Sequence, residues 1–366
     1  MTEVQQTLSF GTTFATFEED DGGESGHQFF APLQFTYSTP RWDIGIKTAL
    51  INSERDSDFE GGSGSVSTLT DTVLSGSYRA YAGTPDWSQG RRVTFSLNAD
   101  VNLPTGQSQL TGSEKNAIFS NFIVDQDRFG EGLNVGIGFS GTLAVTERTL
   151  LGVGLSYIGR GDYNPDGDLT DQELDPGNQV VGSFQVLRTS ENFEVNAGYR
   201  FIFEEETDVN GDAIYDRANS HELFLSGAYQ IDDLWVVRGS ALYATRSADE
   251  LLNPVTGQLE EADEDDTGDT YYLSLGVGRQ LTSRDQIGVD LSYRRQAKND
   301  FDEQNFSFEP NLTRRELSVS YGRMIREGLV ANGSVAYFEV EEGDILGFKG
   351  PKFTGAQFSL GAQYEF

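Results

Sequence analysis

A run of carboxylate and amide side chains with the spacing of a calcium-binding loop stands near the middle of the chain. The segment DYNPDGDLTDQE fits the pattern D-x-[DN]-x-[DN]-G-x5-E, in which side-chain oxygens, one backbone carbonyl and a final bidentate glutamate surround the ion. The predicted ligands are Asp162, Asn164, Asp166, Asp168 and Glu173. No helical pattern flanks the segment, Pro165 stiffens it, and the chain is rich in acids, so a chance match is the alternative.

A second segment, DVNGDAIYD, has a weaker form of the same spacing because it lacks glycine at the sixth position. Its candidate ligands are Asp208, Asn210, Asp212 and Asp216, and the alternative is a solvated turn. A third acidic run contains Glu260, Glu261, Asp263, Glu264, Asp265 and Asp266. Such runs are usually solvated, mutually repelling charges. On an outward-facing loop, divalent cations could also bridge them to anionic lipopolysaccharide.

Residues suited to acid–base or nucleophilic chemistry are scarce. The chain has two histidines, His27 and His221, and no cysteine. Ser220 precedes His221, but neighbouring side chains on a strand point to opposite faces and cannot share a proton. No local hydrolase motif is present, and a Ser–His–acid site assembled from different strands is the alternative. We therefore predict that the protein is not an enzyme.

The composition excludes other classes of protein. A formal net charge of −32 argues against a nucleic-acid partner, which would require clustered Lys and Arg. No run of eighteen apolar residues is present, so no transmembrane helix is expected. Met1 is followed directly by TEVQQTLSF, so an exported protein would be a form from which the leader has been removed. The 42 glycines and the 12% aromatic content favour many strands and turns.

The elements that would carry these residues are strands, because apolar and polar residues alternate along most of the chain. The last nine residues, FSLGAQYEF, place Phe358, Leu360 and Tyr364 on one face and polar residues on the other. About sixteen such segments are long enough to cross a bilayer as tilted strands. They are Thr7–Glu18, Gln28–Ser38, Trp42–Asn52, Thr70–Ala82, Arg92–Leu103, Leu133–Val145, Leu150–Arg160, Gln179–Arg188, Phe193–Glu204, Glu222–Ile231, Leu234–Arg246, Thr270–Leu281, Gln286–Gln296, Thr313–Met324, Leu329–Glu339 and Thr354–Phe366.

The links between these segments alternate in length. Short links such as TPR, TER, TSEN and REG alternate with long acidic ones such as EDDGGESGH and SERDSDFEGGSGSVS. Short periplasmic turns on one rim and long extracellular loops on the other are typical of an outer-membrane barrel. The predicted fold is therefore an all-β, antiparallel transmembrane β-barrel formed by residues 1–366 as a single domain.

One face of each segment carries charges, which would be costly in lipid and which we therefore assign to a wet lumen. The predicted pore-lining residues are Lys47, Asp100, Glu194, Arg200, Glu222, Arg238, Arg246, Asp290, Arg294 and Glu316. They could set a transverse field, or they could be ion pairs that only stabilise the wall. Aromatic residues near segment ends fit interfacial girdles, namely Tyr37, Trp42, Tyr157, Trp235, Tyr243 and Tyr337.

Two stretches of the chain carry a resemblance to known families. The ending FSLGAQYEF resembles the insertion signal of bacterial outer-membrane β-barrel proteins, although Ala362 is small for that pattern. VNLPTGQ, followed by FGEGLNVGIGFSGTLAVTERTLLGVGLSYIGRGD, is similar to the barrel family of transporters associated with phenol meta-cleavage pathways. The first resemblance implies that the terminal Phe366 is read by the barrel assembly machinery. The second covers a small part of the chain and implies a porin-like barrel more than a substrate.

The longest link, 104–132, is a candidate constriction loop. Thr111 and Glu114 have capping-box spacing, and four apolar residues between Ile118 and Ile123 recur at helical spacing, so a short amphipathic helix is expected. The resemblance to classical porins implies a loop that folds inward and narrows the channel; a helix lying over the rim is the alternative. The predicted constriction residues are Glu114, Lys115, Phe119, Phe122, Asp125, Asp127 and Arg128.

Together these features predict a porin-like channel in a Gram-negative outer membrane for passive diffusion of small solutes. One alternative is a transporter for a hydrophobic, aromatic or polymeric substrate, favoured if Phe30, Phe224 and Tyr272 point inward. Another is a structural or adhesive barrel that presents acidic loops, with calcium as their only expected cofactor. The expected partners are outer-membrane lipid, lipopolysaccharide, the assembly machinery and small solutes, with homo-oligomers left open.

Overall fold

A closed antiparallel β-barrel forms the body of the protein. The computed structural model describes residues 4–58, 61–124, 126, 128–169, 172–253, 256–262, 267–305 and 307–366. Its main sheet is 17-stranded, and β1 (Gln5–Glu19) pairs with β22 (Lys352–Glu365), which closes the sheet. β4 (Gly64–Leu69) and β5 (Thr72–Gly83) follow one another along β3 (Trp42–Ser57), so the wall is a 16-strand barrel.

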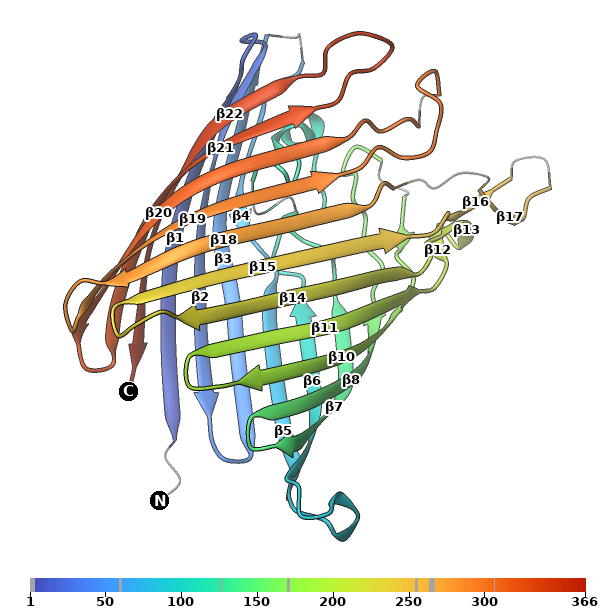
Figure 1. Cartoon of the computed structure of the whole chain (residues 1–366). Coiled ribbons are helices and arrows are strands. Elements are labelled where there is room, and N and C mark those ends of the chain that lie inside the picture. Colours follow the sequence, from blue (N-terminus) through green and yellow to red (C-terminus); the bar gives the residue numbers. More distant parts are fainter. Residues whose placement is uncertain are drawn as a thin grey trace.

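The remaining strands follow in chain order, each paired with its sequence neighbour in the wall (Figure 1). They are β2 (Glu24–Ser38), β6 (Val93–Leu103), β7 (Asn134–Thr146), β8 (Thr149–Arg160), β10 (Gln179–Thr189), β11 (Phe193–Glu204), β14 (Ser220–Gln230), β15 (Trp235–Arg246), β18 (Thr270–Gln280), β19 (Asp285–Gln296), β20 (Leu312–Arg326) and β21 (Leu329–Glu342). Closure pairs the backbone groups of every strand, which is the condition for a sheet to lie in lipid. The predicted barrel and its strand number are confirmed.

The two rims differ as the link lengths predict, with three departures. The termini lie on the rim of the short links (Figure 1). On that rim, residues 84–92 form a longer link that contains the 3-10 turn η1 (Asp86–Ser88). On the other rim, most of EDDGGESGH belongs to β1 and β2, which leaves a turn at residues 20–23. Much of SERDSDFEGGSGSVS likewise belongs to β3 and β4, so these two loop predictions were wrong in extent.

The long links build a second sheet that the alternation pattern does not predict. Its strands come from three successive links and are ordered β17-β16-β13-β12-β9. They are β9 (Leu174–Asp175), β12 (Thr207–Val209), β13 (Asp212–Asp216), β16 (Glu250–Leu252) and β17 (Leu259–Glu261). These strands are too short to show a period of two in the sequence, which explains why they were read as loops.

The barrel wall is taller on one side. β1 to β3 and β20 to β22 have 14 to 16 residues each, whereas β6 to β19 of the wall have 11 to 13. Three additional residues lengthen a strand by about 10 Å. The extra length carries apolar residues on the inner face, and the link 104–133 packs against them.

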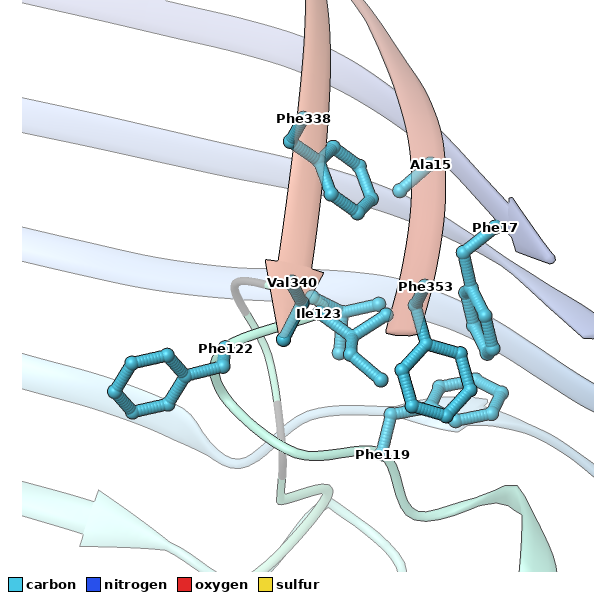
Figure 2. Close-up of a cluster of buried hydrophobic side chains, with 9 residues drawn as sticks. Ala15, Phe17, Phe119, Phe122, Ile123, Phe338, Val340 and Phe353 are labelled. Atoms are coloured by element: carbon cyan, nitrogen blue, oxygen red, sulfur yellow. The ribbon is translucent and has the colours of Figure 1, made fainter. Parts of the chain in front are cut away.

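The hydrophobic core therefore lies inside the barrel, between the taller wall and this link, which we call the inner loop. One cluster joins four inner-loop residues from Phe119 to Val124 to side chains of β1, β21 and β22. In Figure 2, Phe119 lies beside Phe17 and Phe353, and Ile123 lies beside Val340. A second cluster joins Leu110, Ala117 and Phe129 to β3 and β4.

Helical structure is minor. The inner loop contains the 3-10 helix η2 (Gly112–Ala117), which is shorter than the amphipathic helix expected through Ile123. The expected N-terminus is right, because the Thr111 and Glu114 capping box is present. The chain leaves the helical path after Ala117 because Phe119 and the residues after it pack into the wall. Among the described residues, no helix has the length and apolar character needed to cross a membrane.

Candidate functional site

The two faces of the wall differ in chemistry. On β6, Leu97 is 54% exposed on the outer face, while Asp100 belongs to the opposite set of side chains. The same parity holds along the other strands, where large exposed apolar residues alternate with polar ones. By this register all ten predicted pore-lining residues face inward: Lys47 on β3, Asp100 on β6, Glu194 and Arg200 on β11, Glu222 on β14, Arg238 and Arg246 on β15, Asp290 and Arg294 on β19, and Glu316 on β20.

Several of the inward charges form ion pairs. The Arg200 Nε donates to Glu222 Oε2 at 2.8 Å, and these two residues are direct cross-strand neighbours. Arg238 makes a bidentate contact with Asp290, at 2.9 Å from Nε and 2.7 Å from Nη2. This second pair spans β18, where Gly276 leaves the space. A Cβ there would lie 1.9 Å from the Asp290 carboxylate.

Both ends of the inner loop are held by one carboxylate, that of Asp71 between β4 and β5. It accepts hydrogen bonds from the backbone N–H of Gly106 at 2.9 Å and of Glu131 at 2.8 Å. It also accepts one from the Asn102 side chain at 2.7 Å. The departing and returning legs of the loop therefore meet at the same point of the wall.

The middle of the inner loop is tied to the next long link. Lys115 forms ion pairs with Asp166 and with Asp168, the latter at 2.9 Å, and the Gly112 N–H donates to Asp168 at 2.9 Å. The Lys115 ammonium lowers the pKa of Asp166 and Asp168, and these carboxylates raise the pKa of Lys115. Glu114 accepts from Thr111, and these hydrogen bonds lower its pKa.

Two arginines hold the tip of the inner loop. Arg314 of β20 donates to the carbonyls of Phe122 at 2.9 Å and Ile123 at 3.1 Å. Its guanidinium lies 4.3 Å from the centre of the Phe338 ring. Arg294 of β19 donates to the Asn121 carbonyl at 2.9 Å and to its side-chain oxygen at 3.1 Å. The tip is thus bound to the wall by cations as well as by apolar packing.

The predicted constriction residues take different positions within the loop. Phe119 and Phe122 are buried against the wall and act as anchors, so they do not present their rings to the lumen. Glu114 and Lys115 serve the capping box and the contact to the next link. Arg128 pairs with Glu131 at 2.8 Å on the returning leg. Asp125 and Asp127 lie outside the described residues.

The predicted calcium loop makes other contacts. Asn164 accepts from the Asp166 N–H at 2.8 Å, Asp166 accepts from the Asp168 N–H at 2.9 Å, and Lys115 pairs with both aspartates. Glu173 immediately precedes β9; its N–H donates to the side-chain oxygen of Asn210 at 2.8 Å, and its carbonyl accepts from the Asn210 N–H at 2.8 Å. Among the described residues, no group of three or more acidic or histidine side chains is placed to hold a metal, and Asp162 therefore belongs to no such group.

The second acidic segment is a β-hairpin. Asp208 lies on β12, Asp212 begins β13, and the turn between them is Asn210–Gly211 with φ of 55° and 83°. Asn-Gly with two positive φ angles is the preferred two-residue hairpin turn. Asp216 stands opposite Glu250, and burial together with this neighbour raises its pKa.

In the third acidic run, Glu260 accepts hydrogen bonds from Asn253 and Thr256. The side chain of Glu261 and residues 263–266 lie outside the described part.

The comparisons with known proteins give structural likenesses only. No family model and no curated protein matches the sequence. The chain is similar to the outer-membrane channel DcaP of Acinetobacter baumannii, with 10% identity, a TM-score of 0.48, and coverage of 100% of this chain and 97% of that one. It is also similar to the CymD monoaromatic hydrocarbon channel, with 12% identity, a TM-score of 0.46, and coverage of 99% of this chain and 88% of that one. An anion-selective porin from Comamonas acidovorans has 14% identity, a TM-score of 0.44, and coverage of 100% of this chain and 99% of that one. The fold itself rests on the strand pairing described above.

Both histidines face outward, at the rim of the long links. His27 Nε2 lies 3.6 Å from the Glu54 carboxylate, and His221 Nδ1 lies 2.7 Å from the Tyr199 hydroxyl. Ser220 belongs to the inward set, so it does not share a face with His221. The predicted girdle aromatics are on the outer face, with Trp42 packed 4.4 Å from Tyr78 between ring centres.

Two residues that organise the lumen, Asp71 and Arg314, were not predicted from the sequence. Arg314 has the parity of Glu316, so its inward direction was readable. A second signal was also present: near the long links, β1 carries apolar residues on both faces, with Phe14 outward and Ala15 and Phe17 inward. An inner face that becomes apolar indicates a part of the wall that something covers.

Proposed function

We propose that the chain is a channel of the Gram-negative outer membrane through which small solutes diffuse passively. The observation that supports this most is the exposure of inward charges. Arg200 and Arg238 keep 47% and 48% of their side chains exposed although both face the barrel interior. A plugged barrel would bury them, so we infer a water-filled lumen along β11 to β19. The proposal involves no bond-making step.

The filter would combine size and charge. The inner loop occupies lumen volume along the taller wall, which leaves the passage between the loop and the β6-to-β15 part of the shorter wall. We propose that the loop is the constriction. Paired charges such as Arg200–Glu222 would present local fields of both signs rather than one strong field.

Single-channel conductance in planar bilayers tests this function. Purified protein in a KCl gradient should give stable steps of current with a definite reversal potential. Protein that is folded, as shown by its resistance to unfolding in unheated SDS, but gives no steps would contradict the open channel. Its long links would then be the part to test, by binding assays for surface partners.

A second candidate is a route for aromatic or other hydrophobic solutes. Phe30, Phe224 and Tyr272 belong to the inward set, and Phe224 covers Gly198 on the neighbouring strand. Liposome uptake distinguishes the two functions. Passage of toluene faster than passage of glycerol would favour the hydrophobic route, and the reverse order would favour the polar channel.

We also propose that the long links bind calcium, in competition with the Lys115 ammonium. The Lys115 ammonium occupies two of the predicted ligands, Asp166 and Asp168, so the ion would have to displace it. Calorimetric titration of calcium into chelator-treated protein should therefore detect tighter binding in Lys115→Gln than in the wild type. Equal affinities would mean that calcium does not bind at this loop.

We further propose lipopolysaccharide and the barrel assembly machinery as partners, and a crosslinking assay in membranes would report any homo-oligomer.

A further inference from the structure

A cavity of about 270 Å³ opens into the lumen where the inner loop meets β3 and β5. Phe30, Ala49 and Val73 form an apolar floor on its wall side, and the polar residues Thr70, Asp71 and Asn102 lie on the same side. Its loop side includes Arg128 and Gln126, and Lys47 of β3 also lines it. A small site with an apolar floor and a few converging polar groups is typical of ligand-binding cavities.

Lys47 marks the boundary of the part of β3 that the loop covers. Going along the inner face of β3 toward the short links, Ile51 and Ala49 are each 2% exposed, whereas Lys47 is exposed to the lumen. Gly45 follows and has no side chain. A solute that passes the inner loop on this side would therefore meet the Lys47 ammonium directly.

The other charges at the cavity already have partners. Asp71 accepts three hydrogen bonds from the legs of the loop, and Glu131 pairs with Arg128. No carboxylate of the described residues lies within ion-pair distance of Lys47. Of the two cations among the described lining residues, Lys47 is therefore the one without a carboxylate partner.

A second cavity, of about 320 Å³, continues from Lys47 toward the rim of the short links. Its lining includes hydroxyl and amide side chains such as Ser9, Thr13, Gln34 and Ser359, and among the described residues that line it Lys47 is the single charged one. These groups are neutral, and their O–H and N–H can donate hydrogen bonds to an anion.

We propose that Lys47 and the first of these cavities, the one with Phe30 and Val73, form a binding station for small organic carboxylates with an apolar body. The carboxylate would pair with the Lys47 ammonium, and the apolar body would lie on Phe30 and Val73. The station rests on the proposed channel function and deepens it by naming a solute class, which the net charge of −32 would not suggest.

The test uses benzoate as the probe in bilayers holding the wild-type channel in KCl. Benzoate should lower the channel current in a saturable way, and acetate, which lacks the ring, should do so only at higher concentration. Lys47→Gln should raise the half-blocking concentration of benzoate about tenfold, because a charge-assisted hydrogen bond is lost. Lys47→Arg should stay close to the wild type.

The controls separate the station from the channel. Lys349→Gln, the same change in the exposed link between β21 and β22, should leave the block unchanged. Equal block of wild type and Lys47→Gln, or equal block by benzylammonium, overturns the station. If the wild type does not conduct, the channel proposal fails on its own. Benzoate line broadening in NMR of detergent-solubilised protein then decides the station: broadening that Lys47→Gln removes supports it, and broadening that Lys47→Gln leaves unchanged overturns it.

Discussion

Arg314 shows how a single side chain joins the inner loop to the wall. Its side chain is 9% exposed, and it reaches two loop carbonyls, the Phe338 ring and the carboxylate of Glu316. A buried guanidinium is stable only when its donors are satisfied, and here the loop backbone satisfies part of them. The arginine and the loop tip therefore depend on each other.

We predict that Arg314→Gln loosens the loop tip. Two backbone carbonyls and Glu316 lose their donors, which should cost about 1 to 3 kcal/mol of local stability. The expected result is a channel that inserts normally but shows larger current fluctuations and a higher mean conductance. Arg315→Gln is the matched control, because Arg315 faces outward and pairs with Glu339 and Glu341. Equal behaviour of the two variants would mean that Arg314 does not hold the loop.

Lys115 and its two aspartates give the loop a predictable response to pH. The pKa of Asp166 and of Asp168 lies below the ordinary 3.8, so their contribution is complete above that pH and is lost as pH falls through the lowered values. The pKa of Lys115 is raised above the ordinary 10.5, so its contribution is complete below pH 10.5 and is lost as the pH rises through the raised value. Current fluctuations should therefore stay constant from pH 5 to 9 and rise only when the pH falls below 3.8. In Lys115→Gln this acid-induced rise should disappear; a rise of the same size in that variant would contradict the assignment.

At the scale of elements, the inner loop shows where a local pattern competes with tertiary packing. The spacing of Ile118, Phe119 and Phe122 satisfies a helix, yet the helix ends at Ala117. Burying Phe119 and Phe122 to 2% and 1% exposure against the wall outweighs the few hydrogen bonds of another helical turn. Helical spacing in a loop thus indicated which residues are buried but not their backbone shape.

The hairpin turn of the second sheet can be tested at Gly211. Its φ of 83° is in the left-handed region, and a β-branched residue there is strained by about 1 to 2 kcal/mol. Gly211→Val should therefore open the β12–β13 hairpin and speed tryptic cleavage after Arg217, with conductance unchanged. Ala213→Val adds bulk on the same hairpin at an ordinary strand position and should cleave at the wild-type rate. Cleavage of Gly211→Val at the wild-type rate would show that the hairpin does not depend on this turn.

At the scale of the whole molecule, the two faces of the wall set the environment in which the barrel folds. Leu360 of β22 is 70% exposed on the outer face, and Ser359 beside it bonds to Thr13 on the inner face. We predict that Leu360→Arg lowers the free energy of unfolding in lipid vesicles by about 2 to 4 kcal/mol, as expected for a charge near the bilayer midplane. Ser359→Arg should cost much less. Urea titrations in vesicles measure both, and equal costs would place both faces in the same solvent.

Much of the architecture was readable from the chain because each strand repeats the same period of two. That period, with the alternation of short and long links, gave the strand number, the closed sheet and the inward parity of Lys47, Arg200 and Arg238. These are local properties, set by which side chains can face water and which can face lipid. The ends of strands were less readable, as at β4 and at the turn 20–23, because acidic residues are tolerated in a strand that extends above the membrane.

The sequence by itself therefore determined the barrel, its two faces and the loop that matters most, residues 104–132. Only the tertiary structure decided where that loop lies, which links join into the second sheet, and that Lys115 occupies the predicted calcium loop. These features depend on contacts between residues far apart in the chain, such as Arg314 with Phe122 or Asp71 with Glu131. A periodic pattern records the direction of each side chain, but not the partner that it meets across the lumen.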